Sequence, residues 1–128
     1  MRSDAREVAL KVLFAENFGS DNLEELKNAL TKNLKPADAA FAETLLNLVR
    51  SHKAELIQEI DSHICNFKEN RLYNEDKCIL LIAMAEIKYL DDIPPVVSVN
   101  EAVNLATKYS TQHSPDFING LLAGVINP

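Results

Sequence analysis

The segment from Asn74 to Leu90 constrains the fold of this chain most strongly. Its middle reads ILLIAMAEI, with helical spacing and apolar residues at almost every position. A helix that is apolar all round must be buried on every side. This one is shorter than the ~18 residues that a membrane span requires. The segment therefore predicts a central helix surrounded by other helices of a water-soluble bundle.

Helical periodicity also runs through most of the remaining chain, whereas strand signals are almost absent. Residues 1–128 therefore predict a single all-α domain, a bundle of about seven helices. Caps, prolines and glycines mark the expected ends of the helices. The first three run from Ser3 or Asp4 to Gly19, from a capping box at 21–24 to about Asn33, and from Pro36 to Cys65 with a break near Ser51–His52. The central helix follows, and two more come after Pro94–Pro95, the last starting at Ser114 or Pro115.

Composition narrows the class of protein further. Hydrophobic residues make up 47% and charged residues 25%, as in soluble globular proteins. The absence of a signal segment at the N-terminus makes the cytoplasm the expected location. Cys65 and Cys78 have neither disulfide-framework nor zinc-ribbon spacing. His63 and Cys65 could supply two metal ligands, but nothing nearby supplies the others, so we expect no metal and no cofactor.

The sequence offers no recognisable catalytic site. It has no glycine-rich phosphate loop, no G-x-S-x-G and no H-E-x-x-H. The three histidines are scattered, and none has an evident nucleophile beside it. We therefore expect a binding protein rather than an enzyme.

The distribution of charge is informative about partners. The net charge is −6, yet the first 35 residues are neutral, so the rest of the chain carries the whole excess of acid. A polyanion would be attracted to the first segment or to isolated basic sites rather than to the body. The acidic body suits a basic protein partner at least as well.

Two features of the first helix could bind a phosphate group or a protein partner. Arg2 and Arg6 lie four residues apart, on one face, where arginines can pair with phosphate. The alternative is an ordinary solvated face. A first helix that also buries Val8 and Val12 leaves no room in the core for both Phe14 and Phe18, so one of them could anchor a partner. The alternative is that both lie in the core.

A third feature is the polar turn between the last two helices. Phe117 follows this turn near a helix N-terminus, where free N–H groups favour anions. His113 lies in the turn, and Lys108 and Tyr109 lie just before it. An aromatic ring, a lysine and a helix N-terminus could hold a stacked base and its phosphate. The alternative is a packing corner.

Several stretches, taken in order, resemble one family. AREVALKVLF, DKCILLIAMAEI, PVVSVNEAVNLA and DFINGLL are similar to segments of the NusB transcription-antitermination family, and the resemblance extends over nearly the whole chain. It implies an all-helical, non-enzymatic protein without cofactor. It also implies a factor that pairs with the ribosomal protein NusE, recognises boxA-type RNA and acts on the transcription elongation complex of ribosomal RNA operons.

The resemblance assigns roles to particular positions. RNA contact falls on Arg2, Arg6, Lys108, His113 and Phe117, although Ser3 and Asp4 stand where further arginines are usual. Contact with NusE falls on Phe14 and Asp76. Leu81 and Ala85 depart from a common arginine and tyrosine. Signature positions expected to be mainly structural are Asn100 as a cap, Glu101, Asn119, and Gly120 in close helix packing.

Because each phosphate contact adds almost one unit to the salt slope, a depleted basic segment should bind RNA poorly without a basic partner. Two other classes stay open. The same fold resembles an accessory domain of ribosomal RNA cytosine methyltransferases, and the net charge also allows a helical protein–protein adaptor without RNA binding. A homodimer that hides the RNA surface is a further possibility.

Overall fold

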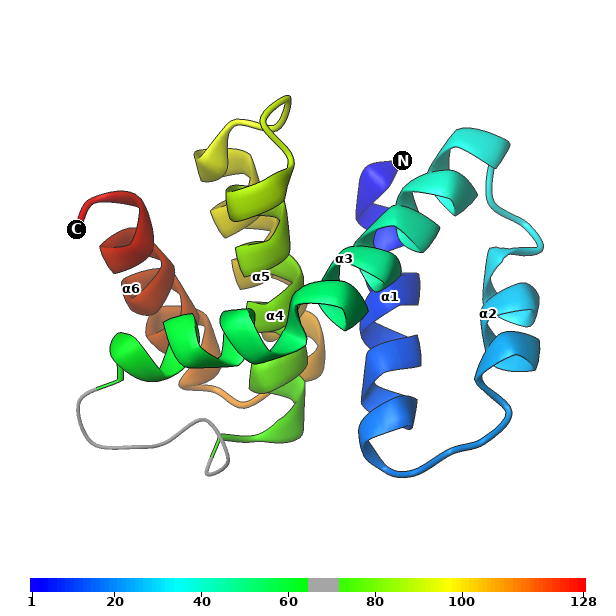
Figure 1. The fold of residues 1–128 in the computed structure, drawn as a ribbon, viewed down its shortest axis with the longest axis horizontal. Helices are drawn as coiled ribbons and strands as arrows, with labels where there is room; N and C mark the ends of the chain where they lie inside the picture. The colour runs from blue at the N-terminus through cyan, green and yellow to red at the C-terminus, as the bar shows by residue number, and fades with distance from the viewer. Residues whose placement is uncertain (65–71) are drawn as a thin grey trace.

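The computed structural model describes residues 1–64 and 72–128, and within these ranges the regular structure is entirely helical (Figure 1). The predicted all-α class is confirmed. The described residues form six helices rather than the predicted seven or so, because residues 36–62 form one bent helix instead of two. The helices are α1 (Arg2–Asn17), α2 (Leu23–Thr31), α3 (Pro36–Ser62), α4 (Asn74–Tyr89), α5 (Pro95–Tyr109) and α6 (Ser114–Ile126).

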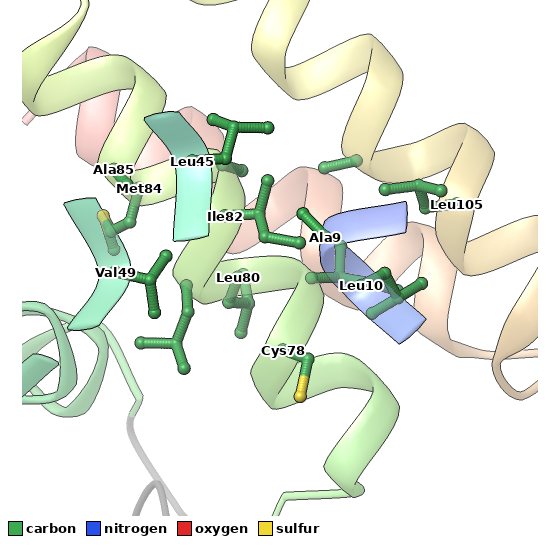
Figure 2. Close-up of a cluster of buried hydrophobic side chains, with 14 of the residues drawn as sticks. Ala9, Leu10, Leu45, Val49, Cys78, Leu80, Ile82, Met84, Ala85 and Leu105 are labelled. Atoms are coloured by element: carbon green, nitrogen blue, oxygen red, sulfur yellow. The ribbon is translucent and has the colours of Figure 1, made fainter. Parts of the chain in front are cut away.

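Helix α4 lies at the centre, as its composition predicted. Every residue from Cys78 to Glu86 is buried, and α4 packs against α1, α3, α5 and α6. Figure 2 shows side chains of α4 such as Ile82 meeting Leu45 of α3 and Ala9 of α1. Burying apolar area on all sides of one helix is the main favourable term in this fold, at roughly 25 cal/mol per Å².

The end of α1 turns the chain outward. Gly19 has a φ of +81°, the left-handed conformation that glycine adopts without steric cost. The Ser20 N–H donates to the Ala15 carbonyl at 3.1 Å, and the Gly19 N–H donates to the Glu16 carbonyl at 3.0 Å. This pair of bonds is a Schellman motif. The chain then leads into α2, which packs on the outside of α1 with none of its residues fully buried.

The predicted break in the long third helix is confirmed at His52, whose φ of −121° and ψ of 19° are not helical. The His52 ring stacks on Tyr89 with centroids 4.1 Å apart. The Tyr89 hydroxyl donates to Glu55 at 3.1 Å. These contacts hold the bend against the last turn of α4.

A buried ion pair joins α1 to α4. Arg6 is 3% exposed, and its Nε and Nη2 donate to the two carboxylate oxygens of Glu86 at 2.7 Å each. Ser98 of α5 donates to the same carboxylate at 2.8 Å. Arg6 Nη1 also donates to Glu101 at 3.1 Å, and Ser3 donates to that carboxylate at 2.6 Å. The network fixes α1 against both α4 and α5, and Glu101 has the structural role expected of it.

Three local expectations are wrong. Helix α2 starts at Leu23 after Asn22, without a side-chain capping bond, so Asp21 opens no capping box. Asn100 lies inside α5 and cannot cap it, because Pro95 already begins that helix. Gly120 is exposed, and a Cβ there would meet nothing within 4 Å, so close packing does not require glycine.

Replacing Arg6 with alanine should strongly destabilise the fold. The change leaves the buried Glu86 carboxylate without its cation, which typically costs about 3–5 kcal/mol. Urea denaturation followed by circular dichroism measures this loss.

Arg50→Ala is the control. Arg50 pairs with Glu16 at 3.3 Å on the surface, and its side chain is 36% exposed. Its loss should cost no more than about 1 kcal/mol. Equal losses for the two variants would contradict the structural role of the Arg6–Glu86 pair.

Candidate nucleic-acid interface

Side chains of α1 and α5 meet along one edge of the molecule, which we call the α1–α5 edge and define by Arg2, Glu7, Lys11, Lys108 and Tyr109. The Glu7 carboxylate accepts hydrogen bonds from Lys108 Nζ at 2.9 and 3.1 Å and from the Tyr109 hydroxyl. Lys11 Nζ lies 5.9 Å from the Tyr109 ring centroid. Two exposed ammonium groups therefore flank one aromatic ring.

Glu7 and Lys108 each shift the pKa of the other. Burial raises the pKa of Glu7, but the hydrogen bonds from Tyr109 and Lys108 outweigh it and the pKa is lowered overall. The hydrogen bond to Glu7 in turn raises the pKa of Lys108. Lys108 is thus firmly charged, but its charge is partly neutralised by a carboxylate of its own chain.

The two predicted N-terminal arginines have different surroundings. The Arg2 side chain is 50% exposed, with its guanidinium 4.4 Å from the Phe41 ring centroid and 3.8 Å from Asp92. Arg6 is buried in the ion-pair network described above. Direct RNA contact by Arg6 is therefore corrected to a structural role, because its guanidinium already bonds two carboxylates and does not reach the surface.

The polar turn between α5 and α6 is a packing corner on its inner side. The Ser110 hydroxyl donates to the Asp76 carboxylate of α4, and the Ser114 hydroxyl donates to it at 3.0 Å. Ser114 also contacts Thr111 Oγ1 at 2.7 Å. These bonds tie the turn to the first turn of α4.

The outer side of the same turn faces solvent. His113 is exposed and precedes the first residue of α6, while Phe117 is half-buried in the first turn. Phe117 therefore packs on the core and still presents part of its ring. The packing-corner interpretation therefore holds for the inner side, whereas binding at the outer side stays a prediction.

Asp76 does not lie where a direct partner contact needs it. Its side chain is 4% exposed, and both carboxylate oxygens accept hydrogen bonds from the turn. The expected contact with NusE is therefore corrected to a positioning role beneath the turn.

Phe14 lies at an aromatic edge of α1. It is half-buried, and its ring meets Phe18 edge-on with centroids 4.9 Å apart. Phe18 is 72% exposed, so the alternative that both rings lie in the core is wrong. Phe14 also lines a small hollow of about 140 Å³ together with Leu10, Lys11, Glu75 and Tyr109.

A larger hollow of about 410 Å³ lies beside the turn, lined by Leu72, Tyr73, Asp76, Thr111, His113, Ser114 and Phe117. Sequence reasoning missed Tyr73 and Glu7 as site residues. Glu7 and Lys11 have the i, i+4 spacing of one helix face, which could have pointed to Glu7. No local signal places Tyr73 near Phe117, because only the packing of α4 against α6 brings them together.

Other kinds of site have little support within the described residues. Residues 1–64 and 72–128 contain no group of three or more His, Cys, Asp or Glu side chains able to hold a metal ion. Cys65 lies outside these ranges, and Cys78 is buried, with burial raising its pKa to about 12. No helix that the structure describes is long and apolar enough to cross a membrane.

The NusB family model matches residues 3–127, almost the whole chain. The chain belongs to the NusB family. It is 35% identical to the transcription antitermination protein NusB of Clostridium novyi (strain NT), over 98% of this chain and 97% of that protein. In this NusB-family chain Leu81 and Ala85 stand where an arginine and a tyrosine are common. Both are buried in α4, so neither makes a polar contact at the surface.

Solved NusB structures share the fold. T. maritima NusB aligns with a TM-score of 0.91 at 24% identity, over 99% of this chain and 91% of that one. A chain from a crystal structure of the antitermination factors NusB and NusE in complex with dsRNA aligns with a TM-score of 0.87 at 26% identity, over 98% of this chain and 96% of that one.

Asp76→Ala should loosen the turn between α5 and α6 without unfolding the protein. It leaves the Ser110 and Ser114 hydroxyls without their acceptor, at a cost of about 1–3 kcal/mol. Hydrogen exchange should accelerate at the amides of residues 111–117 more than in α1. Asp116→Ala, an exposed acid in the first turn of α6, is the control and should leave this exchange nearly unchanged. Unchanged exchange in Asp76→Ala would contradict the positioning role.

Proposed function

We propose that this NusB-family chain acts as a transcription antitermination factor that binds boxA-type RNA together with the ribosomal protein NusE. The observation that carries the proposal is the full-length similarity to a NusB chain solved with NusE and RNA. In this role residues 1–128 act as one domain, in the cytoplasm, on the transcription elongation complex of ribosomal RNA operons. The protein contributes binding rather than catalysis.

The basic and aromatic groups outside the core support an RNA path over two adjoining regions. Arg2, Lys11 and Lys108 along the α1–α5 edge contact phosphates, and His113 and Phe117 at the turn contact bases. Phosphate contacts supply most of the affinity, whereas base contacts supply the sequence preference. Thr111 and His113 follow Tyr109 closely in the chain, so the two regions are continuous.

RNA affinity of the protein alone is low. The net charge is −6, Arg6 bonds Glu86, and Lys108 bonds Glu7, so few cations are free for phosphate. A basic partner adds positive charge to the complex and is attracted to the acidic body. The same facts favour the second candidate, a helical adaptor that binds protein but not RNA.

NusE binds near the Phe14–Phe18 edge in this proposal. An exposed aromatic ring beside a half-buried one is typical of an anchor for a protein partner. Phe14 also lines a hollow with Lys11 and Tyr109, so the protein-binding and RNA-binding surfaces adjoin. Bound NusE can therefore continue the RNA path that begins on this chain.

A titration tests this function. Fluorescently labelled boxA-type RNA is titrated with the protein alone and with NusE at two salt concentrations, and a scrambled RNA serves as the control. We expect weak binding by the protein alone, much tighter binding with NusE, and a preference for boxA over the scrambled sequence. Phe14→Ala should weaken the association with NusE. Light scattering of the same samples distinguishes a monomer from a homodimer.

Binding of NusE without any RNA binding would favour the adaptor. Equal affinity for boxA and scrambled RNA would contradict specific recognition.

Glu7→Gln should tighten RNA binding in the complex. Glutamine does not neutralise Lys108, so the ammonium becomes available to a phosphate, and the salt slope should steepen by almost one unit. A single contact of about 1 kcal/mol corresponds to roughly a fivefold lower Kd. Fluorescence anisotropy over a range of salt concentrations measures both quantities.

Glu16→Gln is the matched control, because Glu16 lies on the same helix and pairs with one cation, Arg50, away from the proposed RNA path. It changes the net charge equally but should leave the salt slope unchanged. Weaker RNA binding by Glu7→Gln would show that Glu7 positions Lys108 instead of competing for it.

A further inference from the structure

The hollow beside the α5–α6 turn has two aromatic walls from different helices. Tyr73 immediately precedes α4, and Phe117 lies in the first turn of α6. The hollow measures about 410 Å³, enough for a planar group beside these rings. Tyr73 is 64% exposed, although burial of a tyrosine ring is strongly favourable. An exposed aromatic beside a hollow is a platform for stacking rather than part of the core.

The floor of the hollow is polar but already partly satisfied. The Asp76 carboxylate accepts from Ser110 through Oδ1 and from Ser114 through Oδ2, and each oxygen retains acceptor capacity. The negative charge of this carboxylate repels phosphate but not a neutral base. Thr111 and His113 add further polar groups to the lining. These groups suit the edge of a nucleobase and exclude its phosphate.

We propose that this hollow holds one unpaired RNA base, stacked against Tyr73 and Phe117, with its polar edge toward Thr111 and His113 of the lining. The inference rests on the proposed function and adds to it a base-binding residue, Tyr73. Stacking on aromatic side chains is the usual way in which proteins hold single-stranded bases, and it contributes strongly at each base.

The position of the hollow favours RNA over a protein side chain. It directly adjoins the turn that follows Lys108 and Tyr109, so a strand whose phosphates lie over Lys108 continues into it. The base then enters the hollow while the backbone stays outside, near the basic groups of α5. A peptide side chain would use the aromatic walls equally well, but it would not connect them to the cations of the α1–α5 edge.

The backbone holds the two walls firmly. The Lys77 N–H donates to the Tyr73 carbonyl at 3.0 Å, so Tyr73 is fixed at the start of α4. The Phe117 N–H donates to the His113 carbonyl at 3.2 Å. The Asp76 hydrogen bonds then set the two helix starts against each other, and the hollow exists before any ligand arrives.

The experiment uses boxA-type RNA in which 2-aminopurine replaces one base at a time, bound to the full chain with NusE at a saturating concentration. One substituted position should show strong fluorescence quenching, which reports stacking. Tyr73→Ala should abolish the quenching at that position and raise the Kd about tenfold, within the range expected for one stacked base. Tyr73→Phe should retain both the quenching and the affinity.

Val96→Ala is the control, since Val96 is a comparably exposed apolar side chain, at 61%, that does not line the hollow. It should leave the quenching unchanged. Thermal denaturation confirms that each variant folds, as expected for changes at exposed side chains.

Unchanged affinity and quenching in Tyr73→Ala, with boxA binding intact, would overturn this inference and leave the proposed function standing. Weaker NusE association with unchanged RNA affinity would assign the hollow to the protein partner and also overturn it. Failure of the unmodified complex to bind boxA RNA would instead reject the proposed function itself.

Discussion

The ion pair between Arg6 and Glu86 is the interaction on which the arrangement of the surface depends. It is almost fully buried and bonds through two parallel N–H···O contacts, so it tolerates little change in the relative position of α1 and α4. A buried pair of this kind contributes little net stability compared with apolar packing, because desolvating both charges is costly. Its value is geometric. By extending to Glu101 and Ser3, it also fixes where α1 lies along α5.

That alignment decides which charges remain for a ligand. Once Arg6 is held against Glu86, the following residue of α1, Glu7, lies against Lys108 and Tyr109. The two most evident cations for an RNA contact are therefore bonded to carboxylates of the same chain, one in the interior and one on the surface. From these internal pairs and the net charge of −6 we expect weak binding of polyanions by the protein alone, in line with the proposal that it acts together with a basic partner.

The turn between α5 and α6 packs on its inner side and offers a candidate binding surface on its outer side. Its serine hydroxyls bond the buried Asp76, while His113 and part of the Phe117 ring remain on the outside. Because the inner bonds are short and buried, the outer groups are presented in a fixed position, which lowers the entropy lost when a ligand binds. The packing corner and the proposed binding surface are thus two sides of the same turn.

The sequence by itself determined the helical class, the central position of α4, the bend at His52 and the stop at Gly19. Each of these follows from local spacing, a run of apolar residues or the conformational freedom of one glycine. It also identified Lys108, His113, Phe117 and Phe14 as candidates. Only the tertiary structure decided that Arg6 and Asp76 are internal, and that Glu7 and Tyr73 adjoin the candidate surface. Charge and aromaticity are properties of single residues, whereas burial and pairing depend on segments distant along the chain that meet only when the helices pack.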